Sequence, residues 1–134
     1  MNKRTRTIYA IAFCTYIAAV LLLCFIKTDG LQQPSFLIFG IEADKIAHFL
    51  MFLPFPVLAY ATFAGKWNEA GRHFILTGIL TVAGTLAAIA TEYIQALLGY
   101  RSGDVNDFIA DVIGIVTGGC AVSIYLLNKF KRRP

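Results

Sequence analysis

The stretch AAIATEYIQALLGYRSGDVNDFIADVIG, which runs from Ala87 to Gly114, is the part of this chain around which we interpret the rest. Its ionisable residues lie in otherwise mostly apolar sequence, and they are Glu92, Arg101, Asp104, Asp107 and Asp111. Ionisable side chains in or beside membrane-spanning segments are energetically costly, and by default they indicate a functional site. We therefore interpret the rest of the chain as a scaffold that holds these residues at one face of a membrane.

The composition of the whole chain also predicts a membrane protein. The 134 residues are 57% hydrophobic and 15% charged, with a mean hydropathy of +0.66. A soluble domain usually has about 25% charged residues, so this chain has too few to cover a surface that faces water. Apolar stretches near the roughly 20 residues that cross a bilayer lie at about 8–26, 44–64, 73–98 and 104–127. We predict an all-α fold, a four-helix transmembrane bundle, in which residues 1–134 form a single domain.

The positions of the basic residues predict how this bundle is oriented. Nine of the twelve Lys and Arg residues lie at the two termini or in the loop between the second and third spans. Basic loops tend to stay in the cytoplasm, so both termini are predicted to be cytoplasmic. Seven of the eight acidic residues then lie toward the outer side. This orientation explains the net charge of +4, which therefore does not indicate binding to nucleic acid.

Polar residues from three helix ends are predicted to meet on the outer side. In chain order they are Asp44, Lys45, His48, Glu92, Gln95, Arg101, Asp104, Asp107 and Asp111. Spacings of three, four or seven residues put the members from each span on one face of its helix. Because a charge that faces lipid is costly, these faces are expected to turn toward one another. The sequence thus predicts an acid-rich polar pocket that opens outward.

Structural roles are the alternative for several of these residues. Asp44 and Asp104 stand at predicted helix starts, where a carboxylate caps backbone N–H groups. Glu92 is not at a helix start, and its alternative is an ion pair with Lys45 or Arg101.

The two histidines are interpreted differently. His48 lies among the predicted site residues, although a lone histidine is more often a buried, hydrogen-bonded imidazole. His73 lies at the cytoplasmic end of the third span and is expected at the membrane interface.

Prolines and glycines predict where the helices bend and pack. Pro54 and Pro56 fall inside the second span, and a proline within a helix predicts a kink. Gly114 and Gly118 form a G-x-x-x-G pattern in the fourth span, which is a weak signal of close helix packing. Residues 27–43, between the first two spans, are predicted to form a loop.

The ordered motifs also resemble a known family. Asp44-Lys45-x-x-His48-Phe49 opens one span, Glu92-x-x-Gln95 closes the next, and Arg101 and Asp107-x-x-Ala110-Asp111-x-x-Gly114 follow. From Asp44 to about Gly118 the chain resembles the VanZ-like family, small multi-pass proteins of the bacterial plasma membrane. The resemblance implies a place in the cell envelope, and no biochemical activity is established for the family. Members often carry Asn where this chain has Asp111.

The family takes its name from a protein that confers low-level resistance to teicoplanin. A link to glycopeptide resistance is therefore one of the expectations that the resemblance raises. Many relatives occur without this phenotype.

Our first functional hypothesis is that the outer pocket binds a polar envelope component or a partner protein. A lipid-linked cell-wall precursor or a phospholipid head group would fit such a pocket in the lipid bilayer. The expected binding residues are Lys45, Gln95, Arg101, Asp104 and Asp111.

The alternative hypothesis is an integral membrane enzyme that acts on lipid head groups or lipid-linked wall precursors. His48, Glu92 and Asp107 would be its catalytic residues, with the imidazole or a carboxylate as general base. No cofactor is established by the motifs. A divalent cation could join such a site, although the spacing selects no metal. A third hypothesis, proton movement, lacks ionisable residues in the cytoplasmic half of the spans.

Overall fold

Long apolar helices make up most of the molecule. The structure, a computed structural model, describes residues 3–25, 37–38, 40–98 and 105–132. Its helices are α1 (Lys3–Phe25), α2 (Ala43–Phe52), α3 (Pro54–Phe63), α4 (Ala70–Leu98) and α5 (Val105–Lys131). With α2 and α3 taken as one span, four helical segments are long and apolar enough to cross a membrane. The predicted all-α fold with four spans is confirmed.

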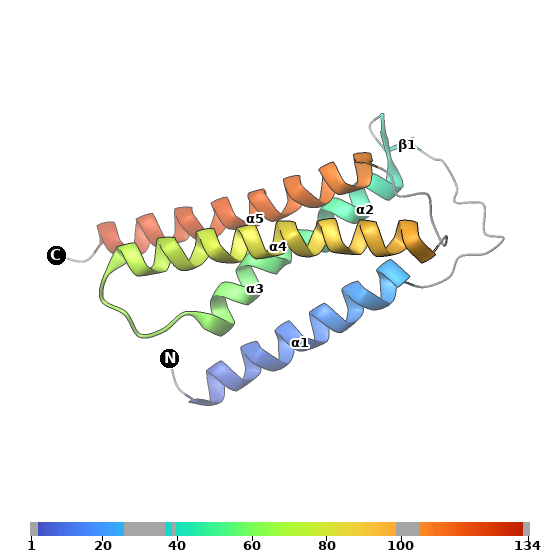
Figure 1. Cartoon of the computed structure of the whole chain (residues 1–134). Helices are drawn as coiled ribbons and strands as arrows, with labels where there is room; N and C mark the ends of the chain where they lie inside the picture. Colours follow the sequence, from blue (N-terminus) through green and yellow to red (C-terminus); the bar gives the residue numbers. More distant parts are fainter. Residues whose placement is uncertain (1–2, 26–36, 39, 99–104, 133–134) are drawn as a thin grey trace.

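The helices lie alongside one another, and α1 and α5 bring the two chain termini to the same end of the bundle (Figure 1). We call this the terminal end. The opposite end, where α2 begins, α4 ends and α5 begins, is called the loop end. Helix α5 packs against α2, α3 and α4, whereas α1 packs mainly against α3. The connectivity therefore gathers three helix ends at the loop end, as the sequence predicted.

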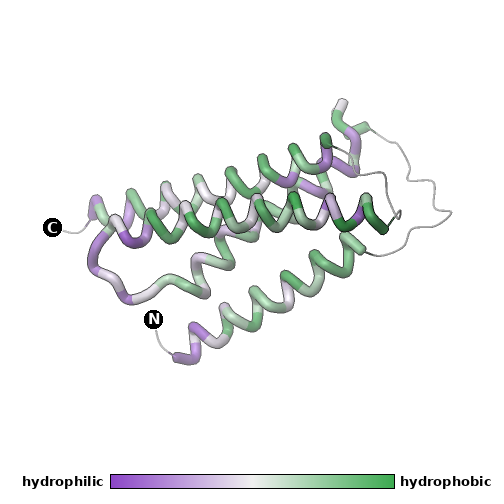
Figure 2. The backbone as a smooth tube through the Cα atoms, in the orientation of Figure 1, coloured by the Kyte–Doolittle hydropathy of each residue, from purple (hydrophilic) through white to green (hydrophobic). Residues whose placement is uncertain are grey.

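The outer surface of the bundle is apolar along much of its length. Figure 2 shows hydrophobic residues along the helices and hydrophilic residues concentrated toward their ends. Large hydrophobic side chains such as Leu22, Ile75 and Leu97 are exposed on this surface. A contiguous apolar surface of this kind suits contact with acyl chains rather than with water. The chain is thus a multi-pass membrane protein.

The second span breaks at Leu53. Helix α2 ends at Phe52, and α3 begins with Pro54 at its first position. Proline lacks a backbone N–H and has a fixed φ, so it is well accommodated in the first turn of a helix. The backbone N–H of Leu53 still bonds to the Phe49 carbonyl at 3.0 Å. The predicted kink is therefore confirmed as an interruption between two short helices.

Two glycines of α5 allow this helix to approach the interrupted span closely. A Cβ atom on Gly114 would lie 2.5 Å from the Phe49 carbonyl oxygen, and one on Gly118 would clash with the Leu53 carbonyl oxygen. Backbones come this close only where side chains are absent. The contact positions α5 against α2, and it places Asp111, one turn before Gly114, opposite the start of the second span.

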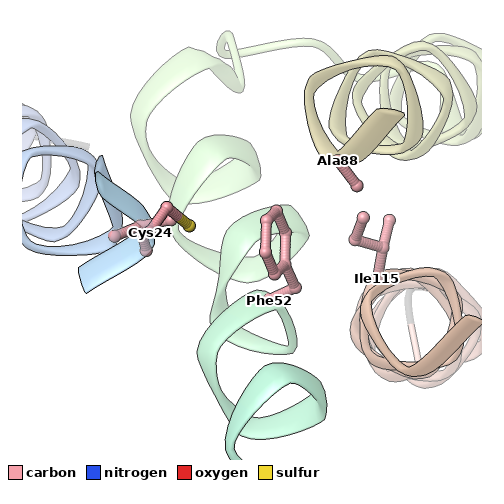
Figure 3. Packing of buried hydrophobic residues seen from close by; sticks show 5 residues of the cluster. Cys24, Phe52, Ala88 and Ile115 are labelled. Atoms are coloured by element: carbon pink, nitrogen blue, oxygen red, sulfur yellow. The ribbon is translucent and has the colours of Figure 1, made fainter. Parts of the chain in front are cut away.

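Two hydrophobic clusters hold the helices together. The one nearer the loop end comprises Val20, Cys24, Phe52, Ala88 and Ile115. Figure 3 shows Phe52 between Cys24 on one side and Ala88 and Ile115 on the other, so that α2 fills the space between α1 and the α4–α5 pair. The second cluster comprises Ala59, Tyr60, Leu80, Val122 and Leu126.

A small hairpin precedes α2, where the sequence predicted only a loop. Strand β1 (Leu37–Ile38) pairs antiparallel with β2 (Ile41–Glu42). Gly40, in the connection, has a φ of 81°, which glycine adopts without steric cost. The loop prediction is thus wrong for these residues, because their backbone groups pair with each other. Since β2 ends at Glu42, the hairpin leads the chain directly into α2.

Candidate functional site

The centre of the candidate site is a buried histidine–aspartate pair between α2 and α5. His48 is 4% exposed and Asp111 is 1% exposed. The Nδ1 atom of His48 lies 2.9 Å from Oδ1 of Asp111, a hydrogen bond in which the carboxylate accepts when Nδ1 carries the proton. The structure therefore brings together two residues that lie 63 positions apart in the sequence.

A second carboxylate faces the other nitrogen of the same imidazole. Oδ2 of Asp107, which lies one turn before Asp111, is 3.9 Å from Nε2 of His48. From α2, Nζ of Lys45 comes within 3.8 Å of Oδ1 of Asp107, and it also pairs with Glu42. Because the Lys45 side chain is 22% exposed, its ammonium group forms the outer rim of the cluster.

Glu92 and Asp44 complete the polar cluster at the loop end. The possible ligand atoms of His48, Glu92 and Asp111 all lie within 4.8 Å of one another. The same holds for Asp44, His48 and Asp107, so His48 belongs to both groups. Side chains from α2, α4 and α5 thus share a small volume, which agrees with the predicted convergence of the three helix ends.

Asp44 does not occupy the capping position predicted for it. Helix α2 begins at Ala43, its N-cap residue is Glu42, and the Glu42 side chain makes no capping hydrogen bond. The helix starts earlier than predicted because the hairpin strand ends at Glu42. Asp44 lies in the first turn of α2, where a carboxylate still interacts favourably with the helix dipole.

Gln95 connects α4 to α1 rather than pointing only at the cluster. It is buried, and its Nε2 donates a hydrogen bond to the Cys24 carbonyl at 2.7 Å. This bond helps to hold α1 beside the loop end. Its predicted role in binding a substrate stays a prediction. Arg101 and Asp104, also predicted as binding residues, lie outside the described residues.

An apolar groove opens beside the cluster, between α2 and α5. Its volume is about 370 Å³. It is lined by Ile41, Lys45, Ile46, Phe49, Asn106, Ile109, Ala110 and Ile113. Most of this lining is aliphatic or aromatic, and Lys45 and Asn106 are its polar members. Since Lys45 also contacts Asp107, the groove and the buried cluster share one boundary residue.

A second polar pair, which the sequence did not reveal, lies at the terminal end. His73 is 2% exposed, with Nδ1 at 2.7 Å from the Tyr60 hydroxyl and Nε2 at 3.1 Å from the Trp67 carbonyl oxygen. A carbonyl only accepts, so Nε2 of the neutral ring carries the proton and the Tyr60 hydroxyl donates to Nδ1. His73 lies in the first turn of α4 with its ring packed inside the bundle, and its predicted position at the membrane interface stays a prediction. A single histidine at a span end offered no pattern from which this could be predicted.

The cavity around this second pair has a volume of about 720 Å³. Besides Tyr60, Trp67 and His73, its lining includes Lys66 and Lys129. The predicted site residues that the structure describes lie at the other end of the bundle, so the two regions are separate.

Sequence comparisons identify a family and a fungal relative. The profile of the VanZ/LLP1 family matches residues 12–127. A curated protein of Schizosaccharomyces pombe, named uncharacterized protein C11E3.10, is 27% identical over 90 residues, which cover 67% of this chain and 49% of that protein. The chain therefore spans about half the length of the curated relative that it matches. No solved structure matches the chain.

Proposed function

The chain belongs to the VanZ/LLP1 family, and we propose that it binds the head group of a phosphate-bearing lipid at the loop end of its bundle. The ligand is an envelope component, either a phospholipid or a lipid-linked cell-wall precursor. The observation that supports this function is the apolar groove that meets the buried polar cluster at Lys45. Both ligand classes have phosphate next to an acyl or polyprenyl chain, so the two share one recognition chemistry.

The groove and its rim can bind different parts of such a molecule. Ile46, Phe49 and Ile113 present an apolar surface against which a hydrocarbon chain can lie. Lys45 offers an ammonium group to a phosphate, and the Asn106 amide offers further donors. Beyond Lys45, the cluster around His48 would meet the polar part of the head group. A lipid bound in this way keeps its chain in the membrane and its head at the helix ends.

The orientation proposed for the protein follows from its basic residues. Lys66, Lys129 and Lys131, with the basic N-terminus, lie toward the terminal end, which would therefore be cytoplasmic. The loop end would then face outward from a bacterial plasma membrane. A lipid in the outer leaflet could reach the groove sideways, from within the bilayer.

Photo-crosslinking tests this function directly. The purified protein is placed in nanodiscs that contain a photoactivatable phosphatidylglycerol, and labelled peptides are identified by mass spectrometry. We expect labelling of peptides that contain Phe49 or Ile113, and a loss of several-fold in the Lys45→Met variant. Lys66→Met, which removes a lysine from the terminal end, is the matched control and should label like the wild type.

A competitor then separates the two ligand classes. If a lipid-linked wall precursor suppresses the labelling more strongly than unlabelled phosphatidylglycerol, the precursor is the better ligand. Labelling that is spread evenly over the bundle, or that is unchanged by Lys45→Met and by Glu92→Gln combined with Asp107→Asn, would contradict a head-group site here.

Binding of a wall precursor would also connect the protein to glycopeptide resistance, as the family resemblance implies. Expression of the wild-type chain in a teicoplanin-susceptible bacterium should then raise the inhibitory concentration, and the Lys45→Met variant should not. Equal susceptibility in all strains would separate the binding function from resistance.

The buried hydrogen bond between His48 and Asp111 supports a second candidate, an integral membrane enzyme acting on the same head groups. In this function His48 is the general base, Asp111 orients its ring, and Lys45 holds the phosphate. Glu92 and Asp107 would complete the catalytic group. Mass spectrometry of phospholipids incubated with the purified protein should reveal a changed head group, and His48→Gln should abolish the change. If the lipids are unaltered after prolonged incubation, the enzyme function is contradicted and lipid binding remains the proposed function.

A further inference from the structure

We propose that His48, Glu92 and Asp111 bind a divalent transition-metal ion beneath the lipid site. This inference rests on the proposed function, because the ion would lie where the head group ends. Metal binding is nevertheless measured without any lipid, so the two proposals can fail separately.

The spacing of the three side chains suits a common ion. Zinc lies about 2.0–2.2 Å from histidine nitrogen and carboxylate oxygen, so two ligands of a tetrahedral ion are about 3.3–3.6 Å apart. Nδ1 of His48 and Oδ1 of Asp111, now hydrogen-bonded at 2.9 Å, would need to move apart by only a few tenths of an ångström to hold the ion. Glu92 brings the third possible ligand atom within 4.8 Å of both, and a modest side-chain rotation would close that distance. The ligands come from α2, α4 and α5, so the bundle itself organises them.

A second observation concerns the opposite nitrogen of the histidine. Histidines that bind a metal through one nitrogen usually donate the other N–H to a carboxylate, which orients the ring. Oδ2 of Asp107 lies 3.9 Å from Nε2 of His48, beyond hydrogen-bond distance, and a small side-chain rotation would bring it into this role. With Nδ1 bound to the ion, the proton would reside on Nε2, facing Asp107. Asp107 is thus a positioning residue. His48 would bind the ion through Nδ1 and donate the proton on Nε2 to Asp107.

The alternative group of Asp44, His48 and Asp107 is less suited to a cation. Its Asp107 carboxylate lies 3.8 Å from the ammonium group of Lys45, which would repel a divalent ion placed beside it. Burial does not separate the two groups, because each has two buried residues and one partly buried carboxylate, Asp44 in this group and Glu92 in the other. The repulsion from Lys45 therefore decides in favour of His48, Glu92 and Asp111.

The charge of the site also favours a bound cation. Carboxylates taken out of water need a compensating positive charge, and a metal ion is the largest charge that such a site can contain. An acid-rich cluster without a cation would repel the phosphate of a lipid. An ion bound by two carboxylates and one imidazole balances the carboxylate charges and leaves a coordination position for a phosphate oxygen. The inference thus explains how an acidic cluster can accept an anionic head group.

The mixed ligand set indicates which ions to use as probes. Imidazole suits zinc and other transition metals, whereas magnesium and calcium prefer oxygen ligands alone. The full-length protein in detergent is stripped with a chelator, titrated with Zn²⁺ or Mn²⁺, and assayed by elemental analysis and thermal unfolding. We expect about one ion per chain, as for a site with one histidine and two carboxylates, and a higher unfolding temperature with the ion than without it.

Conservative variants assign the ligands. Asp111→Asn keeps the side-chain volume and an oxygen that can accept from His48, so it should fold while binding Zn²⁺ at least tenfold more weakly, an effect of about the size seen for altered metal sites. Glu92→Gln should also weaken Zn²⁺ binding at least tenfold. Asp107→Asn should weaken Zn²⁺ binding about 10–100-fold, because it alters the residue that orients the His48 ring. Glu69→Gln, at an exposed acid outside the cluster, is the matched control and should bind like the wild type.

Four results would overturn the inference. A wild-type protein that retains no Zn²⁺ or Mn²⁺ at micromolar concentration has no such site, whatever the variants do. Unchanged affinity in both Glu92→Gln and Asp111→Asn places the ion elsewhere, and loss confined to Asp44→Asn assigns it to the other group. Lipid labelling that persists in a protein without metal binding contradicts this inference and leaves the proposed lipid site intact.

Discussion

At the residue scale, the contact that organises the loop end is the hydrogen bond between His48 and Asp111. Both side chains are buried, so breaking the bond leaves a polar group that water cannot easily reach. Asp111 contributes a hydrogen-bond acceptor as well as a charge, because its carboxylate oxygen accepts from His48. This distinction leads to a prediction about two substitutions at one position.

Asp111→Ala should destabilise the metal-free protein by about 1–3 kcal/mol, because it leaves the buried His48 donor without its acceptor. Asp111→Asn should cost less than about 1 kcal/mol, because the amide oxygen can still accept. Thermal unfolding in detergent with a chelator present measures both. If both variants lose similar amounts of stability, the charge of Asp111, and not its hydrogen bond, stabilises the pair.

The same reasoning applies at the terminal end. Tyr60→Phe removes the hydroxyl that donates to Nδ1 of His73, and we expect a loss of stability of about 1 kcal/mol. Tyr93→Phe is the matched control, because Tyr93 is exposed on α4 and its change should be neutral. Chemical unfolding in detergent compares the variants. A neutral Tyr60→Phe would mean that the Trp67 carbonyl alone holds the histidine.

At the scale of the elements, the approach of α5 to the break in the second span determines where the site residues lie. Gly114 faces the Phe49 carbonyl, and Gly118 faces the Leu53 carbonyl next to Pro56. Neither backbone group can move aside as a flexible side chain could. The position and rotation of α5 against α2 and α3 therefore depend on the absence of a Cβ atom at Gly114 and Gly118. The position of Asp111 depends on the same two glycines.

Gly114→Ala should destabilise the bundle by about 1–3 kcal/mol, because the added methyl group overpacks a backbone contact. Gly78→Ala is the matched control, since a Cβ there meets no atom within 4 Å. It should be neutral or stabilising by up to about 1 kcal/mol, because alanine favours the helix. Thermal unfolding of both variants tests this, and equal effects would refute the close contact.

The contact also predicts a functional effect of Gly118→Ala. Displacing α5 would widen the space between His48 and Asp111, so Zn²⁺ binding should weaken even though residue 118 touches no proposed ligand. Gly78→Ala should bind as tightly as the wild type. Affinity that is unchanged in Gly118→Ala would show that the helices can separate without disturbing the cluster.

At the scale of the whole molecule, the two ends of the bundle differ in charge and in chemistry. The loop end has the acid cluster, and the terminal end has most of the basic residues. In a membrane this asymmetry favours one orientation, because positively charged loops are retained in the cytoplasm. The proposed access of an outer-leaflet lipid depends on that orientation.

Fusion proteins in a bacterial host measure the orientation. A green fluorescent protein joined after Pro134 should fluoresce and alkaline phosphatase at the same position should be inactive, because the C-terminus is predicted to be cytoplasmic. Phosphatase inserted at the connection between α4 and α5 is the complementary control and should be active. The opposite pattern would place the lipid site on the cytoplasmic leaflet.

Much of this architecture was predictable because it depends on local properties of the sequence. Length and hydropathy of each segment define the four spans, and Pro54 defines the interruption at Leu53. The order of the spans then dictates that His48, Glu92 and Asp111 share one end. The short hairpin at 37–42 escaped prediction because its apolar residues carry no alternation, and only backbone pairing reveals it.

Helix length, polarity and connectivity are properties of the chain alone, so they suffice to predict a four-span membrane bundle with seven of its eight acidic residues toward one end. Which of those residues meet depends on how the helices pack. The pairing of His48 with Asp111, the bond from Gln95 to Cys24 and the enclosure of His73 depend on the rotation of each helix about its axis. That rotation is set by packing between helices, above all where Gly114 and Gly118 let two backbones touch.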